Sequence, residues 1–504
     1  MTTNKSNDAA SNPTWYGEIR YMFTKTDIAH MLPHGINLGD YLTVKSHAIS
    51  IFGQISAGRM PPGNPWPADW QTTFSNWISN GYPQGTASTK SKLLGLNTLA
   101  AKTVQATRIR KEISTLSASE LALLKKAFTA IMKKEPTDPN SYYLHASWHG
   151  LPSQYCMHHA PGYNPWHRAF LVGFENALRS VPGCENVTLP YWDLNTSLPE
   201  VLSQPPFDSY TLPVDIGNGY KEGYVTTRYK AAEIAQNFKT YSVLEDFNRA
   251  STKTDWEDYT GMIDNRANNT TIAAHDGGHV SIGDSMANQQ VSAFDPIFWF
   301  YHCNLDRLFW QWQSEMQATT LAGLLTTIQS DNSRRIFTVP VWQALVPFTD
   351  GPTALTTVKI VDSVTSLDVN YDTQAKPTMM KMIPTTKGST FASDKFFVHT
   401  DKVNARVKGI NRLKIPGSFK VHLLKDDKII ASRAVFQPNE ADKCENCVEN
   451  AIIHLDFELP LTKVSKGKLG VWVEPLDHSQ FGDHFPHKMM GNPTVNVRLL
   501  LSNE

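Results

Sequence analysis

The sequence predicts a mainly α-helical central region followed by a C-terminal β-sandwich domain. Apolar residues recur at helical spacing around residues 165–178 and 298–309, and short β-rich runs separated by turns dominate after about residue 370. A chain of 504 residues also exceeds what one hydrophobic core usually fills, so we expect more than one domain. We place the domain boundaries at 1–105, 106–370 and 371–504.

Residues 1–105 are rich in Gly, Pro and Trp, and the sequence predicts that they form a helical extension packed on the rest of the chain. The stretch faintly resembles the end of a cytochrome-c-like domain. It contains no Cys-x-x-Cys-His motif, so covalently attached haem is not supported. The sequence assigns this region no function.

Composition excludes several classes of protein. Lys+Arg and Asp+Glu both number 47, which leaves no net field to favour nucleic acid or an acidic membrane. The N-terminal residues contain no apolar core of a signal peptide, and no run approaches the ~20 apolar residues of a membrane span. We therefore expect a soluble, cytoplasmic protein, while homo-oligomerisation is left open. Five cysteines in so long a chain predict no disulfide framework.

Three helix starts can be identified by their capping residues. Residues 117–120, Ser-Ala-Ser-Glu, predict a capping box ahead of an amphipathic helix. Asn164-Pro165 and Asp295-Pro296 each predict an N-cap followed by proline at the first helical position. The helices that follow carry His167 and His302 in apolar stripes, so both imidazoles are expected to point into a packed interior.

Six histidines stand out as candidate metal ligands, in two triplets: His149, His158 and His167, then His275, His279 and His302. Neutral imidazole binds copper, zinc, iron and nickel. Two sets of three describe two metal ions that face one another, each with a position open for a shared ligand such as dioxygen. His275 and His279 are four residues apart, which places them on one face of a helix. A zinc helix of the HExxH type is an alternative for this pair, but it would leave the first triplet unexplained.

The strings around these histidines resemble the tyrosinase/catechol oxidase (polyphenol oxidase) family of type-3 copper proteins, of the fungal and bacterial type with a C-terminal lid domain. The strings are NPWHRAFLVGFE at 164–175, LPYWD at 189–193 and AFDPIFWFYHCNLDRLF at 293–309. The family usually has His where Tyr301 stands. The resemblance implies a four-helix bundle that holds a binuclear centre of two copper ions, with the six histidines as ligands.

The resemblance also implies details of the copper ligands. It selects His149 as the first ligand, although the short spacing to His158 keeps His145 as an alternative. Cys156 corresponds to the cysteine that forms a thioether bond with the histidine two residues later, here His158. Phe298, one turn before His302, is expected to pack against the ligand ring and orient it.

The β-rich region after residue 370 contains runs at 395–399, 419–423, 452–457, 470–473 and 495–499. Its position and size resemble the domain that covers the copper site in latent fungal tyrosinases, where an aromatic side chain fills the substrate pocket. Phe481 and Phe485 are the two candidates for such a plug. Cys444 and Cys447 resemble a Cys-x-x-Cys pair implicated in copper delivery, and a purely structural role is equally open.

The resemblance implies a tyrosinase-like polyphenol oxidase. Such an enzyme uses dioxygen to hydroxylate monophenols at the ortho position and to oxidise o-diphenols to o-quinones, so its partners are phenolic and catecholic small molecules. Many tyrosinases carry Asn after the first ligand of the second copper and Glu shortly before it; this chain has Asp276 and Ile272. Asp276 is a candidate catalytic base, or the departure marks a catechol oxidase without monophenolase activity. A haemocyanin-like oxygen-binding protein is the second class.

Overall fold

The computed structural model describes residues 13–15, 18–31, 36–56, 60, 66–84, 108–151, 157–261, 270–339, 342–348, 354–373, 401–478 and 481–500. The chain divides into two compact units: Met1–Thr103 with Thr338–Trp342, and Val104–Phe337 with Gln343–Glu504. Within the described ranges, none of the helices combines the length and the apolar character needed to cross a bilayer.

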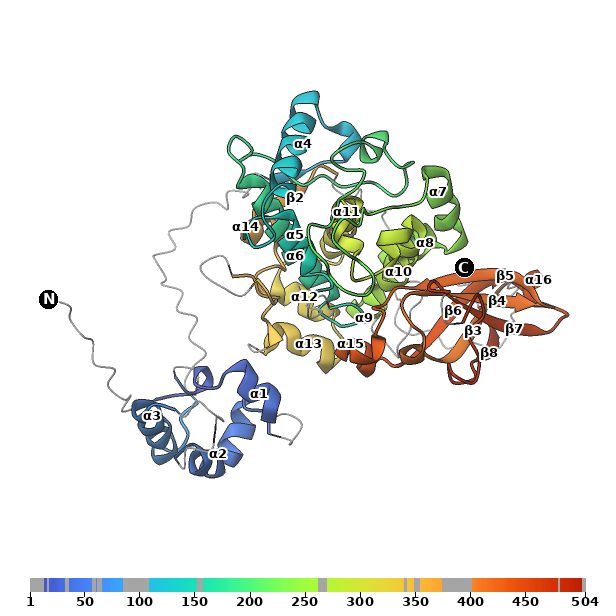
Figure 1. Cartoon of the computed structure of the whole chain (residues 1–504). Helices are drawn as coiled ribbons and strands as arrows, with labels where there is room; N and C mark the ends of the chain where they lie inside the picture. Colours follow the sequence, from blue (N-terminus) through green and yellow to red (C-terminus); the bar gives the residue numbers. More distant parts are fainter. Residues whose placement is uncertain are drawn as a thin grey trace, which may run out of the picture. The chain divides into compact units, whose positions relative to one another are not determined.

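The first unit is helical and has a hydrophobic core of its own. Its described residues form a 3-10 turn and three helices, drawn in blue in Figure 1: η1 (Ile19–Tyr21), α1 (Lys25–Met31), α2 (Tyr41–Ser56) and α3 (Ala68–Ser79). Helix α2 buries residues at helical spacing, among them Val44, Ala48 and Ile51. Trp77 is fully buried, with its ring centroid 5.6 Å from that of Phe74. Aromatic packing therefore holds this small unit together.

The second unit begins with a helical region. Its helices are α4 (Ala118–Met132), α5 (Tyr142–Ser147), α6 (Tyr163–Arg179), α7 (Ala231–Thr240), α8 (Val243–Ser251), α9 (Trp256–Thr260), α10 (Thr271–Ile282), α11 (Ile297–Glu315), α12 (Leu321–Thr327), α13 (Asp331–Thr338) and α14 (Ser363–Leu367). The capping box predicted for α4 is confirmed: the Ser117 side chain accepts from the Glu120 amide, and the Glu120 carboxylate accepts from the Ser117 amide.

Two predicted helix starts differ in detail. Helix α6 begins at Tyr163 with Gly162 as N-cap, so the prediction that Asn164 is the cap is wrong. Pro165 still falls in the first turn, where a backbone N–H has no intrahelical partner and proline is tolerated. Helix α11 begins at Ile297, whose amide donates to Oδ1 of Asp295 at 3.2 Å, close to the predicted arrangement.

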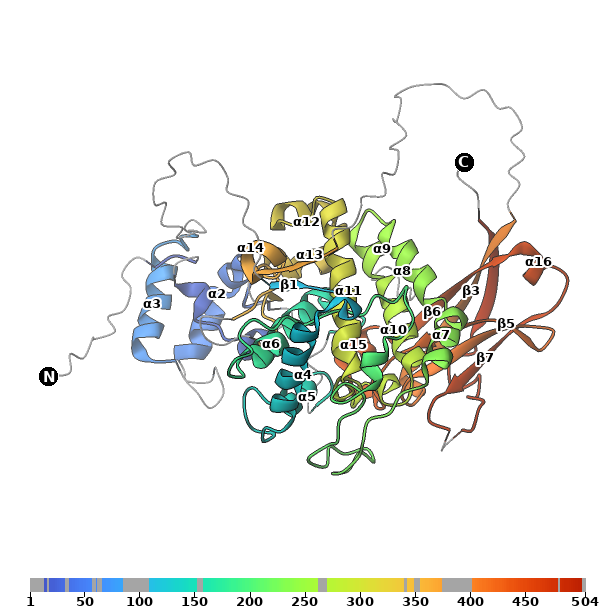
Figure 2. The same ribbon diagram turned by 90° about the horizontal axis from the view of Figure 1, so that it is seen from above.

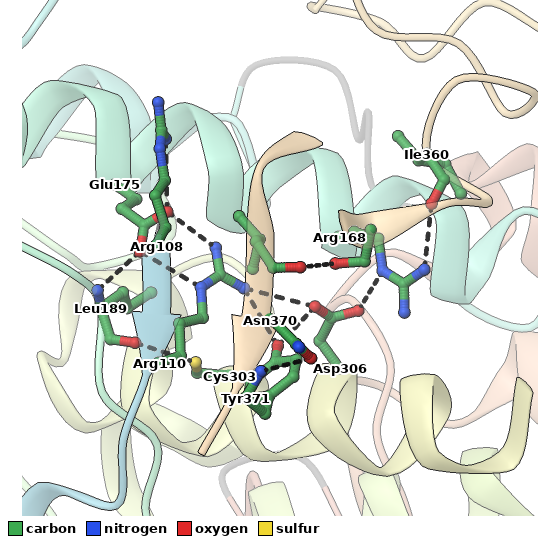
Figure 3. Close-up of polar contacts among 12 residues, drawn as sticks. Arg108, Arg110, Arg168, Glu175, Leu189, Cys303, Asp306, Ile360, Asn370 and Tyr371 are labelled. Carbon is green, nitrogen blue, oxygen red and sulfur yellow. Dashed lines mark hydrogen bonds and ion pairs between the residues drawn. The ribbon is translucent and has the colours of Figure 1, made fainter. Parts of the chain in front are cut away.

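A buried polar network ties α6 to α11 (Figure 3). Strand β1 (Arg108–Arg110) pairs in parallel with β2 (Val369–Tyr371), and this pairing carries Arg110 into the interior. Arg110 has no exposed surface and lies 3.3 Å from both Glu175 of α6 and Asp306 of α11. Asp306 also accepts from Arg168 of α6 at 2.6 Å and from the Tyr371 hydroxyl at 2.6 Å. Because the buried charges neutralise one another, the two helices are held at a defined spacing.

The C-terminal part of the second unit, residues 401–500, consists mainly of strands. They are β3 (Lys402–Asn411), β4 (Phe419–Lys425), β5 (Lys428–Val435), β6 (Ile452–Pro460), β7 (Leu469–Pro475) and β8 (Thr494–Leu499), with the short helices α15 (Glu445–Glu449) and α16 (Leu461–Val464). The strands form two antiparallel three-stranded sheets, ordered β6-β3-β8 and β5-β4-β7. Inward residues of both sheets share one hydrophobic core, for example Val407, Val421 and Leu455. We call this part the C-terminal domain.

Four of the five predicted β-rich runs lie within strands β4, β6, β7 and β8, which confirms them. The run at 395–399 lies outside the described residues, and strands β3 and β5 were not predicted. Helix α10 lies beside strand β5 in both views of the molecule (Figures 1 and 2), and the two elements are in contact. The C-terminal domain is thereby placed against the helix that carries His275 and His279.

Candidate metal centre

The six candidate histidines come together in the interior of the second unit. Residues His149 and His158 lie in the connection between α5 and α6, and the others lie on helices: His167 on α6, His275 and His279 on α10, and His302 on α11. At most 5% of the surface of any of the six residues is exposed. The rings of His167 and His302 stack with centroids 4.7 Å apart, across the helix pair that the network of Figure 3 holds together.

The ligand nitrogens of these residues lie close enough to share metal ions. Three sets have one nitrogen from each residue within 4.8 Å of the others: His275 with His279 and His302; His149 with His167 and His302; and His158 with His167 and His275. The first set is the second predicted triplet. The first predicted triplet is divided between the other two sets, so the two groups of ligands are interleaved.

Hydrogen bonds orient several of the rings with one nitrogen directed inward. His167 donates from Nδ1 to the carbonyl of Tyr163 at 2.8 Å, and His279 donates from Nδ1 to the carbonyl of Met286 at 2.8 Å. In a neutral ring this leaves the lone pair on Nε2. Nε2 of His279 lies 3.0 Å from Nε2 of His302, a separation that suits two ligands about 2.0–2.1 Å from one ion.

The inward nitrogens fit a metal better than they fit hydrogen bonding. Nε2 of His167 and Nε2 of His275 are buried and have no hydrogen-bond partner among the described residues. A buried polar atom without a partner costs about 1–3 kcal/mol. Burial also lowers the pKa of His149 to about 3 and, together with neighbouring rings, lowers the pKa of His302 well below its usual range. The rings therefore stay neutral, as metal coordination requires.

The two alternatives for the first ligand are separated in space. His149 lies among the other rings, with its centroid 4.8 Å from that of His158, and donates from Nδ1 to the carbonyl of Gln289 at 3.3 Å. His145 instead packs its ring against Trp148, centroids 4.5 Å apart, and belongs to none of the three ligand sets. The arrangement favours His149.

Helix α10 approaches α11 closely because of a glycine. A Cβ built on Gly278 would lie 1.9 Å from the hydroxyl oxygen of Tyr301, so only glycine fits. The Tyr301 hydroxyl donates to the carbonyl of His275 at 3.1 Å. Tyr301 thus fixes the backbone of a candidate ligand. Phe298 packs on His302 as the sequence suggested, with stacked rings whose centroids are 4.0 Å apart.

Asp276 is placed differently from a catalytic base. Its Oδ1 lies 3.0 Å from Nδ1 of His275 and its Oδ2 lies 3.0 Å from Nε2 of His159, so both oxygens are engaged. Burial raises the pKa of Asp276, but the attraction between its carboxylate and the neighbouring His159 ring and the hydrogen bonds from His159 and His275 outweigh burial and hold that pKa far below its usual range. A carboxylate with so low a pKa is a weak base. The position of Asp276 instead suits it to orient the His275 ring.

The sequence-based choice of plug is wrong. Phe485 is buried in the core of the C-terminal domain, and Phe481 packs on it with ring centroids 4.7 Å apart. The residue that reaches the histidines is Phe436, directly after strand β5 and fully buried. Its ring stacks on His279 with centroids 4.1 Å apart and an interplanar angle of 19°. Phe436 also contacts His158 edge-on, at 5.4 Å.

Two cysteine predictions have different outcomes. Cys156 lies outside the described residues, so its thioether bond to His158 stays a prediction. Cys444 and Cys447 are buried together at the start of α15, with their sulfur atoms 2.8 Å apart. The hydrogen bond from Cys447 lowers the pKa of Cys444 to about 7. Their role in copper delivery stays a prediction.

Sequence reasoning missed three residues near the centre: Phe436, His159 and Arg412. His159 follows a candidate ligand directly, and that adjacency is a signal that could have singled it out. Phe436 and Arg412 come from the C-terminal domain, more than 130 residues after His302 in the first case and more than 100 in the second. No local pattern marks either, because their importance depends on how the two parts of the unit pack.

Comparison with known proteins gives a consistent picture. The family model described as the common central domain of tyrosinase matches residues 139–214 and 201–315. A tyrosinase of Aspergillus oryzae is 23% identical over 470 residues, covering 67% of this chain and 86% of that protein. The structure of a tyrosinase from Burkholderia thailandensis aligns with a TM-score of 0.56 at 18% identity, covering 78% of this chain and 100% of the other.

Haemocyanins match as well. A G-type haemocyanin of Enteroctopus dofleini is 27% identical over 244 residues, which cover 43% of this chain and 8% of that much longer protein. All six candidate histidines lie within the region that the tyrosinase model matches. The helical region with its associated strands has the fold of the tyrosinase structures.

Proposed function

From the premise that this chain belongs to the tyrosinase family of type-3 copper proteins, we propose that it is a polyphenol oxidase. It uses dioxygen at a binuclear copper centre to hydroxylate monophenols at the ortho position and to oxidise o-diphenols to o-quinones. The six buried histidines at the junction of α6, α10 and α11 are the proposed ligands. Neutral imidazoles and a pair of sites close enough to share a ligand suit this chemistry.

The observation that carries the proposal is the stacking of Phe436 on His279, with ring centroids 4.1 Å apart. A phenyl ring from another domain already lies flat on a candidate ligand, at the depth where the metal ions are expected. A phenol ring has the same shape, so this space is large enough for a phenolic substrate once Phe436 leaves.

Copper in the centre would supply the two-electron reduction of dioxygen. The residues of the chain do the remaining work. Hydrogen bonds from Nδ1 of His167 and His279 to backbone carbonyls hold these rings with Nε2 inward. Phe298 stacks on His302 and limits its rotation. Phe436 keeps water and phenols away from the centre in the intact chain, so we propose that the enzyme is latent until the C-terminal domain moves or is removed.

A second candidate function is catechol oxidation without hydroxylation of monophenols. One observation favours it: both oxygens of Asp276 are engaged by imidazoles, and the residue three positions before His275 is the buried, apolar Ile272, whereas many tyrosinases carry a Glu shortly before this ligand. Deprotonation of a monophenol would then have to use another acceptor.

The test is oxygen consumption by the copper-loaded protein with a simple monophenol and with a catechol, before and after cleavage in the segment 374–400. The proposal predicts quinone from both substrates, with a large rise after cleavage. Quinone from the catechol alone would favour the second candidate. Reversible oxygen binding without any quinone, in both the intact and the cleaved protein, would assign the chain to the haemocyanin-like class.

A further inference from the structure

A row of hydrogen bonds leads from the C-terminal domain to a candidate copper ligand. The Arg412 guanidinium, at the start of the turn η8 (Arg412–Lys414), lies 2.6 Å from Nδ1 of His159. Nε2 of His159 lies 3.0 Å from Oδ2 of Asp276, and Oδ1 of Asp276 lies 3.0 Å from Nδ1 of His275. All four side chains are buried.

The chemistry of the groups sets the direction of each hydrogen bond. A guanidinium can only donate, so Nδ1 of His159 accepts and the proton of this ring is on Nε2, which donates to Asp276. An ionised carboxylate can only accept, so His275 donates from Nδ1. The lone pair of His275 is then on Nε2, the atom that has no hydrogen-bond partner among the described residues. Arg412 thus determines, two groups away, which nitrogen of His275 can bind a metal.

The environment of Arg412 suits this role and offers it few other partners. Arg412 is 1% exposed and forms no ion pair within the part of the chain that the structure describes. Its Nε donates to Oε1 of Gln437 at 2.8 Å. A buried guanidinium is costly unless its charge is compensated, and the carboxylate of Asp276 provides compensation through the His159 ring.

His159 is also held from its backbone side. The Asn450 side chain, just after α15, donates to the carbonyl of His159 at 3.0 Å. His159 has a φ of +55°, a left-handed conformation that costs a non-glycine residue about 1–3 kcal/mol and persists when its surroundings impose it. The C-terminal domain therefore holds His159 through two separate hydrogen bonds, one from Arg412 and one from Asn450.

We infer that Arg412 is a positioning residue of the copper centre. Through His159 and Asp276 it holds His275 in the tautomer and orientation that present Nε2 to the metal. The C-terminal domain then has two effects on the centre: Phe436 covers it, and Arg412 supports one of its ligands. The inference concerns copper binding and does not depend on which phenols the protein oxidises.

The test is the variant Arg412→Met in the full-length protein. Loss of a partner outside the ligands typically lowers metal affinity by about 10- to 100-fold, and we expect the lower end because Arg412 acts through two groups. Affinity is measured for Cu(I) by competition with a chromophoric chelator, and the loaded protein is then examined by its absorption after oxygenation, which we expect to shift or weaken. Arg412→Lys should restore both, because an ammonium group also donates to Nδ1 of His159.

Arg249→Met is the matched control, since it removes an arginine that joins the helical region to Glu458 of the C-terminal domain away from the centre and leaves the row of hydrogen bonds in place. Its copper affinity should equal that of the wild type. The inference is overturned if Arg412→Met binds copper and oxygen as the wild type does, or if the two variants weaken copper binding equally. Should Arg412→Met fail to fold, Asp276→Asn, which cannot accept from both rings as a carboxylate does, must show the same loss. A wild-type protein that loads copper but oxidises no phenol would contradict the proposed function and leave this inference standing.

Discussion

At the scale of single residues, the centre depends on what each imidazole does with its second nitrogen. The Tyr163 carbonyl accepts a hydrogen bond from Nδ1 of His167, and the Met286 carbonyl accepts one from Nδ1 of His279. The other nitrogen of each ring, Nε2, therefore points inward. Burial of the rings removes the competition from protons that exposed histidines experience near neutral pH. The residue that covers the rings is a phenylalanine, which fills the space without offering a ligand atom.

The Phe436→Ala variant should raise activity in the intact chain. Displacing a buried phenylalanine costs about 1.5–3 kcal/mol, so its removal should lower the KM for a small phenol by about 10- to 100-fold. Quinone formation by the copper-loaded full-length protein measures the effect. Phe481→Ala is the control, because Phe481 packs within the C-terminal domain. Equal activation of both variants would contradict the assignment of Phe436 as the covering residue.

Copper uptake should depend weakly on pH in the mildly acidic range. The folded-state pKa of His149 is lowered by burial to about 3, and those of His279 and His302 are lowered in the same direction. These rings are therefore neutral above their lowered pKa values, and protons do not compete with copper until well below pH 6.5. Cu(I) affinity of the metal-free protein at pH 7.5 and at pH 5.5 should agree within about threefold. A steep loss centred near pH 6.5 would show that the rings are accessible to solvent.

At the scale of elements, two features fix the geometry of the centre: the close approach of α10 to Tyr301 and the charged network between α6 and α11. Each feature depends on complementary packing between elements that are distant in the sequence. Gly278 leaves room for the Tyr301 ring, and Asp306 is shared by Arg110, Arg168 and Tyr371 (Figure 3). Gly278 is next to the candidate ligand His279, and Asp306 lies about one helical turn after His302.

Gly278→Ala should destabilise the protein and its copper site. The added methyl would overlap the Tyr301 hydroxyl, and overpacking of this kind costs about 1–3 kcal/mol. Gly277→Ala is the matched control: its nearest neighbour is a Val243 methyl at 3.1 Å, which can shift, and alanine favours the helix by about 0.5–1 kcal/mol. Urea unfolding and copper content measure both. Equal stability of the two variants would contradict the close packing at Gly278.

Asp306→Asn should unfold the helical region more easily than any surface substitution. It leaves two buried arginines without their shared carboxylate, and removing one partner from a buried ion pair costs about 3–5 kcal/mol. Glu440→Gln breaks the exposed pair with Lys443 and should change stability little, because water screens such pairs. Chemical denaturation of the two variants compares them directly. A loss below about 1 kcal/mol in Asp306→Asn would show that the network contributes little.

At the scale of the whole second unit, the C-terminal domain is held on the helical region by charged contacts as well as by Phe436. Arg433 of strand β5 pairs with Asp246 of α8, and both are buried. Arg249 of α8 pairs with Glu458 of β6 at 3.1 Å, at a partly exposed position. The buried pair is the one expected to decide how tightly the domain stays in place.

Asp246→Asn should loosen the C-terminal domain and raise quinone formation by the uncleaved protein. The substitution leaves Arg433 buried without its carboxylate, at a cost of about 3–5 kcal/mol, part of which falls on the contact between the two parts. Glu458→Gln, at the exposed pair, should change activity little because such pairs contribute about 0–1 kcal/mol. Copper-loaded, full-length variants are assayed with a catechol. No difference between the two variants would show that Asp246 does not hold the domain.

The histidines, the helices that carry them and most of the C-terminal strands could be predicted from the sequence. Local signals mark them: the capping box at 117–120, the histidine spacing of four residues on α10, and alternating apolar runs such as 452–457. Strands β3 and β5 escaped prediction because charged and polar residues interrupt their apolar pattern, as in Arg406 and Ser432. The family resemblance rests on the same local strings, so it was available from the sequence too.

What lay beyond the sequence are the pairings between distant segments. Phe436 rather than Phe481 reaches the histidines, Asp276 engages the rings of two histidines with its two oxygens, and His149 rather than His145 enters the cluster. Each outcome depends on which side chains fill a buried space between two elements. These elements are more than 100 residues apart in the sequence, or they lie on opposite sides of a turn. The spacing of residues in the sequence predicts which way a side chain points only within its own helix or strand. Contacts between elements follow from the packing of the complete unit.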